Sequence, residues 1–248
     1  MSRKQRALDP IRAAQFVISC EHASNRLPAK YGGLGLDPKH LGTHIAWDRG
    51  AKEIARALAK LLGRPRHEGA YSRLLIDLNR SLHHRHLIAR ESGGIRVPGN
   101  TAVSPEERQT RVRLYYAPYR EEVLADIQDR VRRVGRCVHL SVHSFTPWIL
   151  GRKRMADYGI LFDPRRSREK ELALLLARRL RAAGRVVRLN SPYRGVSDGF
   201  TTHCRKLFRP SRYLGLEIEV NQKLLRDHKS IRQVAREFSE TVAGALSR

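Results

Sequence analysis

The chain has 248 residues, of which 41% are hydrophobic and 29% charged, and its formal net charge is +25. A chain of this length buries a substantial core, whereas no apolar run approaches the roughly 20 residues that a membrane-spanning helix needs. The three cysteines lie far apart without a C-x-x-C pair, which argues against a disulfide framework and a cysteine zinc site. We therefore expect a globular protein that does not span a membrane.

The strong positive charge raises nucleic-acid binding as an alternative function. The basic residues are nevertheless spread over the whole chain, and aromatic residues, which stack on single strands, make up only 6%. A basic surface would equally attract small anionic substrates. Charge alone therefore does not separate a nucleic-acid-binding protein from an enzyme.

The chain begins with a basic segment, residues 1–13, that has no apolar core behind it. We predict a flexible N-terminus without a secretory signal, and hence a cytoplasmic protein. A buried strand is predicted over about residues 14–20, and it delivers His22 just beyond its end. Neither a repeat nor a linker interrupts the rest, so residues 14–248 are predicted to form a single domain.

A helix is predicted over residues 51–62, because apolar side chains recur there at helical spacing until Gly63. Asp48 lies just before it, where an acidic side chain also suits a helix N-terminus, so a capping role stays open. The next apolar run, Tyr71–Asn79, predicts a second strand. It ends beside Arg80, whose planar guanidinium suits a substrate carboxylate.

Three histidines, His83, His84 and His86, lie in an irregular stretch, residues 81–103. They are as close together as metal ligands often are, but no partner pattern follows them, so we interpret them as part of an exposed loop. Beyond this loop, a serine, a proline and a glutamate at capping-box spacing start a charged helix predicted over residues 104–134.

The most informative stretch is the apolar strand predicted over Cys137–Val142, which is followed by His143 and stopped by Pro147. Open α/β sheets carry their chemistry at the carboxyl ends of strands. Because the first predicted strand also ends at a histidine, His22, the sequence predicts a single site supplied by two strands.

The remaining elements alternate between strands and helices. Strands are predicted at Tyr158–Phe162, Val186–Leu189 and Tyr213–Val220, and helices at residues 172–183 and from Ser230 onwards. This alternation predicts a single-domain α/β fold with a mixed, largely parallel sheet flanked by helices.

A catalytic zinc uses three protein ligands and one open position for water, whose pKa it lowers towards 7. His22 and His143 are the candidate histidines, and Asp48 is the best acidic third. Amide hydrolysis also requires a base that takes a proton from water and passes it to the leaving nitrogen. Glu217 and Glu219 alternate with apolar residues in a predicted buried strand, so both point to one face and their position does not choose between them.

Five stretches with characteristic polar residues occur between about residues 16 and 225. They are Cys20–Asn25 with Pro28, His44–Ala51, Ser72–Arg80, His143–Pro147 and Glu219–Gln222. Together, and in this order, they resemble the N-formylglutamate amidohydrolase family, which is similar to the zinc carboxypeptidases and aspartoacylase. The resemblance implies a zinc-carboxypeptidase-like (phosphorylase/hydrolase-like) fold and a metal-dependent amidohydrolase.

The resemblance also implies roles for individual residues. His22, Asp48 and His143 would hold a divalent metal, with zinc expected, and Glu219 would be the general base. The residues expected to face the substrate are Arg73, Asn79 and Arg80, with Arg194 and His203 as further candidates.

One departure from the carboxypeptidase pattern leaves the third metal ligand open. No glutamate lies three residues after His22, where carboxypeptidases place their second ligand. His44 and Glu21 therefore stay as alternatives to Asp48.

The resemblance is less specific about the substrate. The family's best-known reaction converts N-formylglutamate to formate and glutamate. This chain has Glu-His-Ala-Ser at residues 21–24 rather than Pro-His-Ser-Gly, and many sequences with that form have no obvious link to the reaction. We therefore predict a small anionic N-formyl or N-acyl amino acid as the substrate, with another amide as an alternative.

Overall fold

The computed structural model describes residues 12–149 and 151–246. Of the predicted flexible segment 1–13, residues 1–11 lie outside this description. The strands are β1 (Phe16–Cys20), β2 (Arg66–Glu68), β5 (Cys137–Phe145), β8 (Tyr158–Leu161), β9 (Val187–Leu189) and β10 (Tyr213–Asn221), with two small hairpins, β3–β4 (Glu91–Ser92, Ile95–Arg96) and β6–β7 (Trp148–Ile149, Arg152–Lys153). The α-helices are α1 (Pro38–Leu41), α2 (Ala51–Leu62), α3 (Pro105–Arg111), α4 (Ala117–Val134), α5 (Ser167–Ala182), α6 (Phe200–Leu207) and α7 (His228–Leu246).

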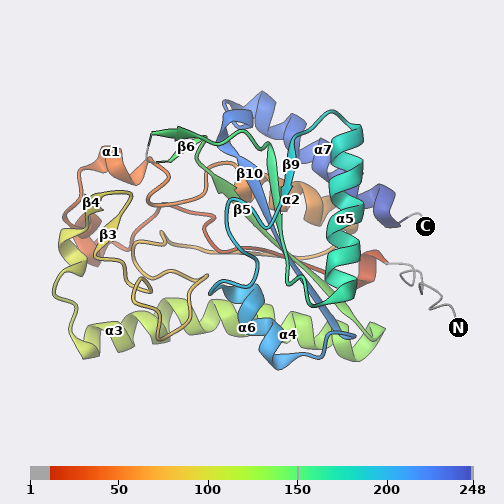
Figure 1. The fold of residues 1–248 in the computed structure, drawn as a ribbon. Coiled ribbons are helices and arrows are strands. Elements are labelled where there is room, and N and C mark those ends of the chain that lie inside the picture. Colours follow the sequence, from red (N-terminus) through yellow and green to blue (C-terminus); the bar gives the residue numbers. More distant parts are fainter. Residues whose placement is uncertain (1–11, 150, 247–248) are drawn as a thin grey trace, which may run out of the picture.

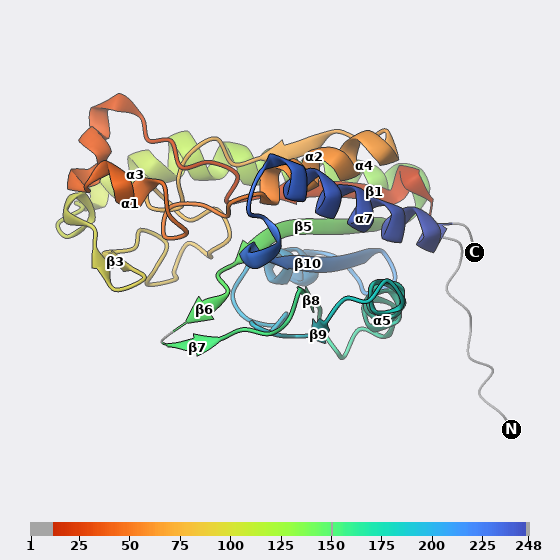
Figure 2. The same ribbon diagram turned by 90° about the horizontal axis from the view of Figure 1, so that it is seen from above.

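Six strands form one sheet in the order β2-β1-β5-β10-β8-β9. β2, β1, β5 and β10 run parallel, whereas β8 is antiparallel to β10 and parallel to β9. Figures 1 and 2 show helices on both sides of this sheet, with α2, α5 and α7 packed on one face and α4 and α6 on the other. The predicted α/β fold with a mixed, largely parallel sheet is confirmed.

The central strand β5 is buried along its whole length, and its side chains alternate between the two helical layers. Val138, Leu140 and Val142 belong to the core beneath α2 and α7. His139, Ser141 and His143 therefore face the layer of α4 and α6. The register pairs His143 with Glu219 of β10 and Ser141 with Ser19 of β1, so polar side chains from three strands share this face.

Helix α2 begins and ends with glycine. Gly63 has φ 57°, in the left-handed region that glycine adopts without a steric penalty, and it ends the helix as predicted. At the other end Gly50 is the N-cap residue, and no side chain caps the helix there. Asp48 is therefore not the cap, and its carboxylate is available for other contacts.

The predicted strand Tyr71–Asn79 is wrong, because this stretch folds into consecutive turns. Backbone hydrogen bonds close the turns from Leu75 to Ser72 and from Arg80 to Asp77. The leucine and isoleucine side chains of the stretch are still buried, but Leu74 belongs to a different core cluster from Leu75, Ile76 and Leu78. A short apolar run reports burial without distinguishing a strand from a buried turn. The strand that pairs with β1 at this edge of the sheet is instead β2.

The helix predicted over residues 104–134 is confirmed, with Ser104 as its N-cap, and it includes a π-helical segment at Val112–Tyr116 between α3 and α4. Helix α6, which begins at Phe200 and includes His203, was not predicted from the sequence. Within the described residues, no helix is both long and apolar enough to cross a membrane.

Candidate metal and substrate site

A cavity of about 260 Å³ lies at the carboxyl ends of β1, β5 and β10, where an open α/β sheet carries its ligands. Most of the predicted site residues meet there, although they come from segments almost 200 positions apart. The lining residues are His22, Asp48, Arg73, Asn79, Arg80, His143, Ser144, Tyr193, Arg194, Ser197, Asp198, Glu217 and Glu219.

His22, Asp48 and His143 form a buried cluster whose potential ligand atoms lie within 4.8 Å of one another. Asp48 Oδ2 is 3.3 Å from His22 Nδ1 and 2.9 Å from His143 Nδ1. The backbone N–H of Ser144 also donates to this oxygen. Both histidines therefore direct the same ring nitrogen at one carboxylate. The alternative third ligands, His44 and Glu21, do not belong to this cluster.

The opposite nitrogen of each histidine ring contacts a second carboxylate. His22 Nε2 is 2.7 Å from Asp77 Oδ1, and His143 Nε2 is 3.1 Å from Glu21 Oε2. Histidines that bind metals usually donate their second N–H to such a partner, which fixes the ring orientation and tautomer. Asp77 was not among the site residues predicted from the sequence, because it lay within the predicted strand Tyr71–Asn79 and carried no recognisable role there.

These close carboxylates determine the protonation of the histidines. Burial alone would lower the pKa of His143, but hydrogen bonds to Asp48 and Glu21 raise it well above its ordinary value. Conversely, burial would raise the pKa of Asp48, but His22 and His143 hold it far below its ordinary value. Asp48 is therefore ionised, as a metal ligand must be.

Glu217 and Glu219 both line the cavity, but their surroundings differ. Glu217 Oε1 accepts a 2.6 Å hydrogen bond from Thr201 Oγ1. Glu219 Oε2 is buried and has no hydrogen-bond partner in the described protein. Burial, with Asp48 and Glu217 nearby, raises the pKa of Glu219 to about 7 even though His143 opposes the shift. Glu219 therefore offers a buried carboxylate oxygen that no group among the described residues engages.

The predicted substrate-side residues occupy one wall of the cavity. Arg73 Nη2 donates to Asp77 Oδ2 over 2.9 Å, and its Nη1 is 3.5 Å from Asp48 Oδ1. Arg80 Nη1 donates to the backbone oxygen of Asp198. Asn79 Oδ1 accepts from the backbone of α6, and its Nδ2 lies 3.5 Å from His143 Nε2. This wall is thus rigid and cationic.

Two further candidates come from the segment after residue 190. Arg194 lines the cavity and is exposed, together with Tyr193, which the sequence analysis did not single out. His203 is not among the lining residues. It follows Thr201 by two positions in α6, a rotation of about 200°, so it points away when Thr201 reaches Glu217.

His83, His84 and His86 do not belong to the cluster of His22, Asp48 and His143. His83 and His86 are exposed, and the rings of His84 and His86 are tilted by 45° with their centroids 5.6 Å apart. No potential metal-binding cluster among the described residues includes any of the three. The prediction of an exposed loop is confirmed.

A family model described as N-formylglutamate amidohydrolase matches residues 14–226. The chain belongs to this family. It is accordingly a hydrolase that acts on a non-peptide amide bond, and the predicted family resemblance is confirmed. No curated protein sequence matches the chain.

Two solved structures share the fold. A gene product of Agrobacterium tumefaciens is 32% identical, with a TM-score of 0.85 over 95% of this chain and 93% of that one. An N-formylglutamate amidohydrolase from Ralstonia eutropha JMP134 is 22% identical, with a TM-score of 0.68 over 95% of this chain and 92% of that one. Both alignments span nearly the whole length of the chain.

Proposed function

We propose that the chain is a metal-dependent amidohydrolase that cleaves an N-formyl or N-acyl amino acid. His22, Asp48 and His143 would hold a divalent cation, for which zinc is expected because two imidazoles and a carboxylate are its usual donors. The convergence of both Nδ1 atoms on one buried oxygen of Asp48 is the observation that carries this proposal. When bound, the cation would supply a Lewis acid that activates water and polarises the substrate carbonyl.

The metal site is supported by the way in which the cluster is held. Three buried groups converge, and each imidazole is fixed from behind by Asp77 or Glu21. A convergent donor set of this kind leaves one side facing the cavity. These residues therefore fit a catalytic cation, which needs three protein ligands and an open position.

Glu219 is proposed as the general base. Its Oε2 has no protein partner, and a pKa of about 7 suits a group that must take up and release a proton near neutral pH. Glu219 would accept a proton from water and deliver it to the leaving nitrogen. Glu217, whose Oε1 is engaged by Thr201, would help to orient the end of β10.

The cationic wall is proposed to bind the carboxylate of the substrate. Arg80 and Arg194 line the cavity beside Asn79, and Arg73 adds positive charge while it holds Asp77. A cavity of about 260 Å³ suits a substrate of amino-acid size. N-formylglutamate is the first substrate to test, because it gives the family its name. A different N-acyl amino acid or related amide is the second candidate.

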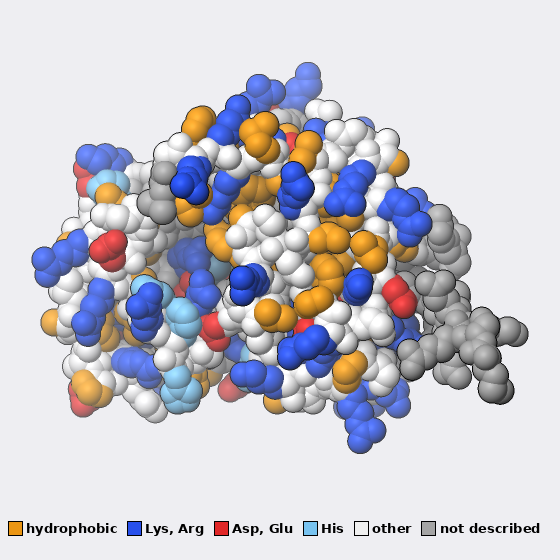
Figure 3. Space-filling model, viewed as in Figure 1, with side chains coloured by type: hydrophobic (Ala, Val, Ile, Leu, Met, Phe, Trp, Pro, Cys, Tyr) orange, Lys and Arg blue, Asp and Glu red, His pale blue; other side chains and the backbone are white. Residues whose placement is uncertain are grey.

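Nucleic-acid binding receives less support. Figure 3 shows lysine and arginine side chains scattered over the face that it displays, interrupted by apolar and uncharged surface, rather than gathered in a single patch. A scattered basic surface favours attraction of small anions over a defined nucleic-acid interface.

The test combines metal analysis with hydrolysis of a panel of substrates. Protein purified without chelator should contain about one zinc per chain, or acquire it on titration, and should release free amine from N-formylglutamate or another N-acyl amino acid. Removal of the metal should abolish this release, and zinc should restore it. Failure of the apoprotein to bind any divalent cation at micromolar levels would refute the metal-dependent mechanism.

A further inference from the structure

A second carboxylate lies directly behind His143 and is more deeply buried than the cluster itself. Glu21 follows β1 and its side chain is fully buried. Its Oε2 accepts a 2.6 Å hydrogen bond from Ser141 Oγ and is 3.1 Å from His143 Nε2. Its Oε1 accepts a 3.1 Å hydrogen bond from the hydroxyl of Tyr119. Both carboxylate oxygens are therefore partnered.

Burying an ionised carboxylate is costly unless it is fully hydrogen-bonded. The hydrogen bonds from Ser141 and Tyr119 satisfy the two oxygens of Glu21 and offset this cost. His143 is thus held at both ring nitrogens, by Asp48 at Nδ1 and, at Nε2, by Ser141 Oγ at 2.9 Å and Glu21 Oε2 at 3.1 Å. Such two-sided support leaves the ring little freedom to rotate.

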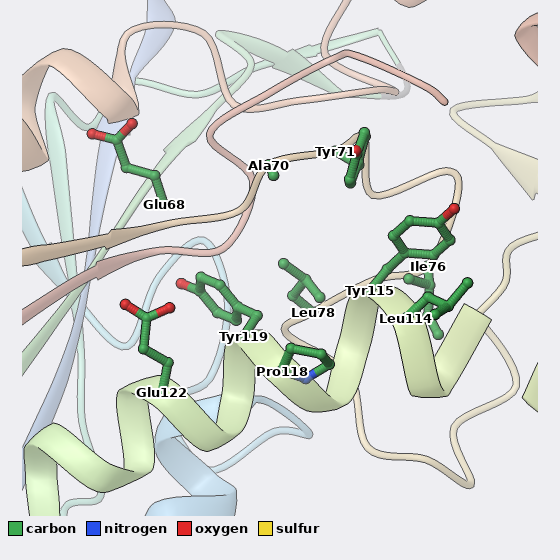
Figure 4. A pocket seen from close by; sticks show the side chains of 10 residues that line it. All are labelled: Glu68, Ala70, Tyr71, Ile76, Leu78, Leu114, Tyr115, Pro118, Tyr119 and Glu122. Atoms are coloured by element: carbon green, nitrogen blue, oxygen red, sulfur yellow. The ribbon is translucent and has the colours of Figure 1, made fainter. Parts of the chain in front are cut away.

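Tyr119 connects this buried carboxylate to a second cavity. It belongs to α4, and its ring lines a separate cavity of about 210 Å³ that is mainly apolar. Figure 4 shows Tyr119 rising from α4 beside Pro118 and Leu78, with its hydroxyl directed away from Tyr71 and Tyr115. That hydroxyl reaches Glu21, so α4 helps to set the position of the carboxylate.

We propose that Glu21, oriented by Tyr119 and Ser141, is a positioning residue that holds the His143 imidazole in the orientation needed to bind the metal. This inference rests on the proposed metal site. It assigns to Glu21 an indirect role, through His143, instead of the direct ligand role that the sequence left open.

The decisive experiment measures the zinc affinity of apoprotein variants by competition with a chromogenic chelator. Glu21→Gln removes the charge but keeps the size of the side chain, and we expect zinc affinity to fall about 10- to 100-fold, as for other outer partners of ligating histidines. Tyr119→Phe removes one hydroxyl, and we expect a reduction of about fivefold. At saturating zinc, Glu21→Gln should lower kcat while KM stays close to wild type, because the substrate wall is unchanged.

Glu169→Gln is the matched control. Glu169 of α5 is also a fully buried carboxylate, but its partners are Arg205, Arg166 and the backbone of Asp163 and Gly215. We expect this variant to lose stability with unchanged zinc affinity.

Different outcomes separate the inference from the function on which it rests. Wild-type zinc affinity in a folded Glu21→Gln protein would overturn the positioning role and leave the metal site intact. If that variant does not fold, unchanged affinity in Tyr119→Phe would overturn it instead. Absence of zinc binding in the wild-type protein would overturn the proposed metal site and the inference together.

Discussion

The two ends of β5 present histidines in opposite situations. His139 and His143 are four residues apart on the same face of one strand, and both are buried. His139 is 2.8 Å from Ser19 Oγ and 2.8 Å from the Tyr213 hydroxyl, and burial lowers its pKa to about 4. His143 lies between two carboxylates that raise its pKa.

The comparison shows that charged partners beside a cavity, and not burial itself, distinguish a functional histidine from a structural one. His139 is neutral and has an uncharged partner at each nitrogen, so it satisfies its polar atoms within the core. His143 lies where ionised groups converge beside a cavity, and Glu219 Oε2 nearby has no protein partner. The amino end of β5 is therefore built for stability, whereas the carboxyl end retains polar atoms for a ligand.

The largest expected effect on metal binding and turnover comes from removing His143, at the carboxyl end of β5. His143→Ala should reduce zinc affinity by more than about 100-fold, the upper end of the cost of losing only an outer partner, and turnover should fall to background. His139→Gln should keep about one zinc per chain. Elemental analysis of both proteins and hydrolysis assays check this, and equal metal loss in two folded variants would remove the distinction between the ends.

The next largest effect concerns the unpartnered carboxylate. Glu219→Gln should lower kcat by about 10²- to 10⁴-fold, the usual contribution of a general acid–base group, while metal content stays intact. Glu217→Gln should mainly lower the melting temperature, because Glu217 Oε1 is bound by Thr201. Steady-state kinetics, metal content and thermal melts should be compared side by side. An active Glu219→Gln beside an inactive, metal-loaded Glu217→Gln would exchange the two roles.

Burial of His139 at the amino end of β5 should affect how the stability of the protein depends on pH. The folded pKa of His139 lies near 4, below its ordinary 6.5, so between these values the unfolded chain binds a proton that the folded chain does not. Stability should therefore fall by up to about 3 kcal/mol as the pH drops from 6.5 to 4.

Comparison with His139→Gln isolates this contribution from other titrating groups. Urea unfolding of both proteins at several pH values should show a shallower acid decline in the variant, even though it is less stable at pH 7. Identical pH slopes would show that His139 does not titrate between the two states.

The smallest of these effects concerns the substrate wall. Arg80→Lys keeps the charge but loses the planar fork, so kcat/KM for a free acid should fall about 10- to 100-fold, as expected for one hydrogen bond between charged groups. A substrate with a blocked carboxylate should respond little. Equal losses on both substrates would place the carboxylate contact elsewhere, at Arg73 or Arg194.

The sequence determined much of the framework of this protein. Alternating apolar residues specified β1, β5 and β10, and the polar residues that follow them placed His22 and His143 at adjacent strand ends. The family motifs were not needed to predict these two positions. A buried strand is recognised from its local pattern of apolar residues, and the polar residues that carry function follow the carboxyl ends of such strands. Asp48 was the best acidic third ligand on the residues alone, although its position suited a helix cap equally well, and the family motifs favoured the ligand role.

Only the tertiary structure decided which polar atoms meet. The sequence could not choose between Glu217 and Glu219, because both point to the same face of β10; Thr201, on a helix that the sequence did not predict, engages Glu217 and leaves Glu219 Oε2 unpaired. Asp77 and Glu21 likewise became partners of the histidines through chain packing over long separations. Periodicity reports how each segment is buried, whereas hydrogen-bond pairing depends on the register and packing of segments distant in the chain.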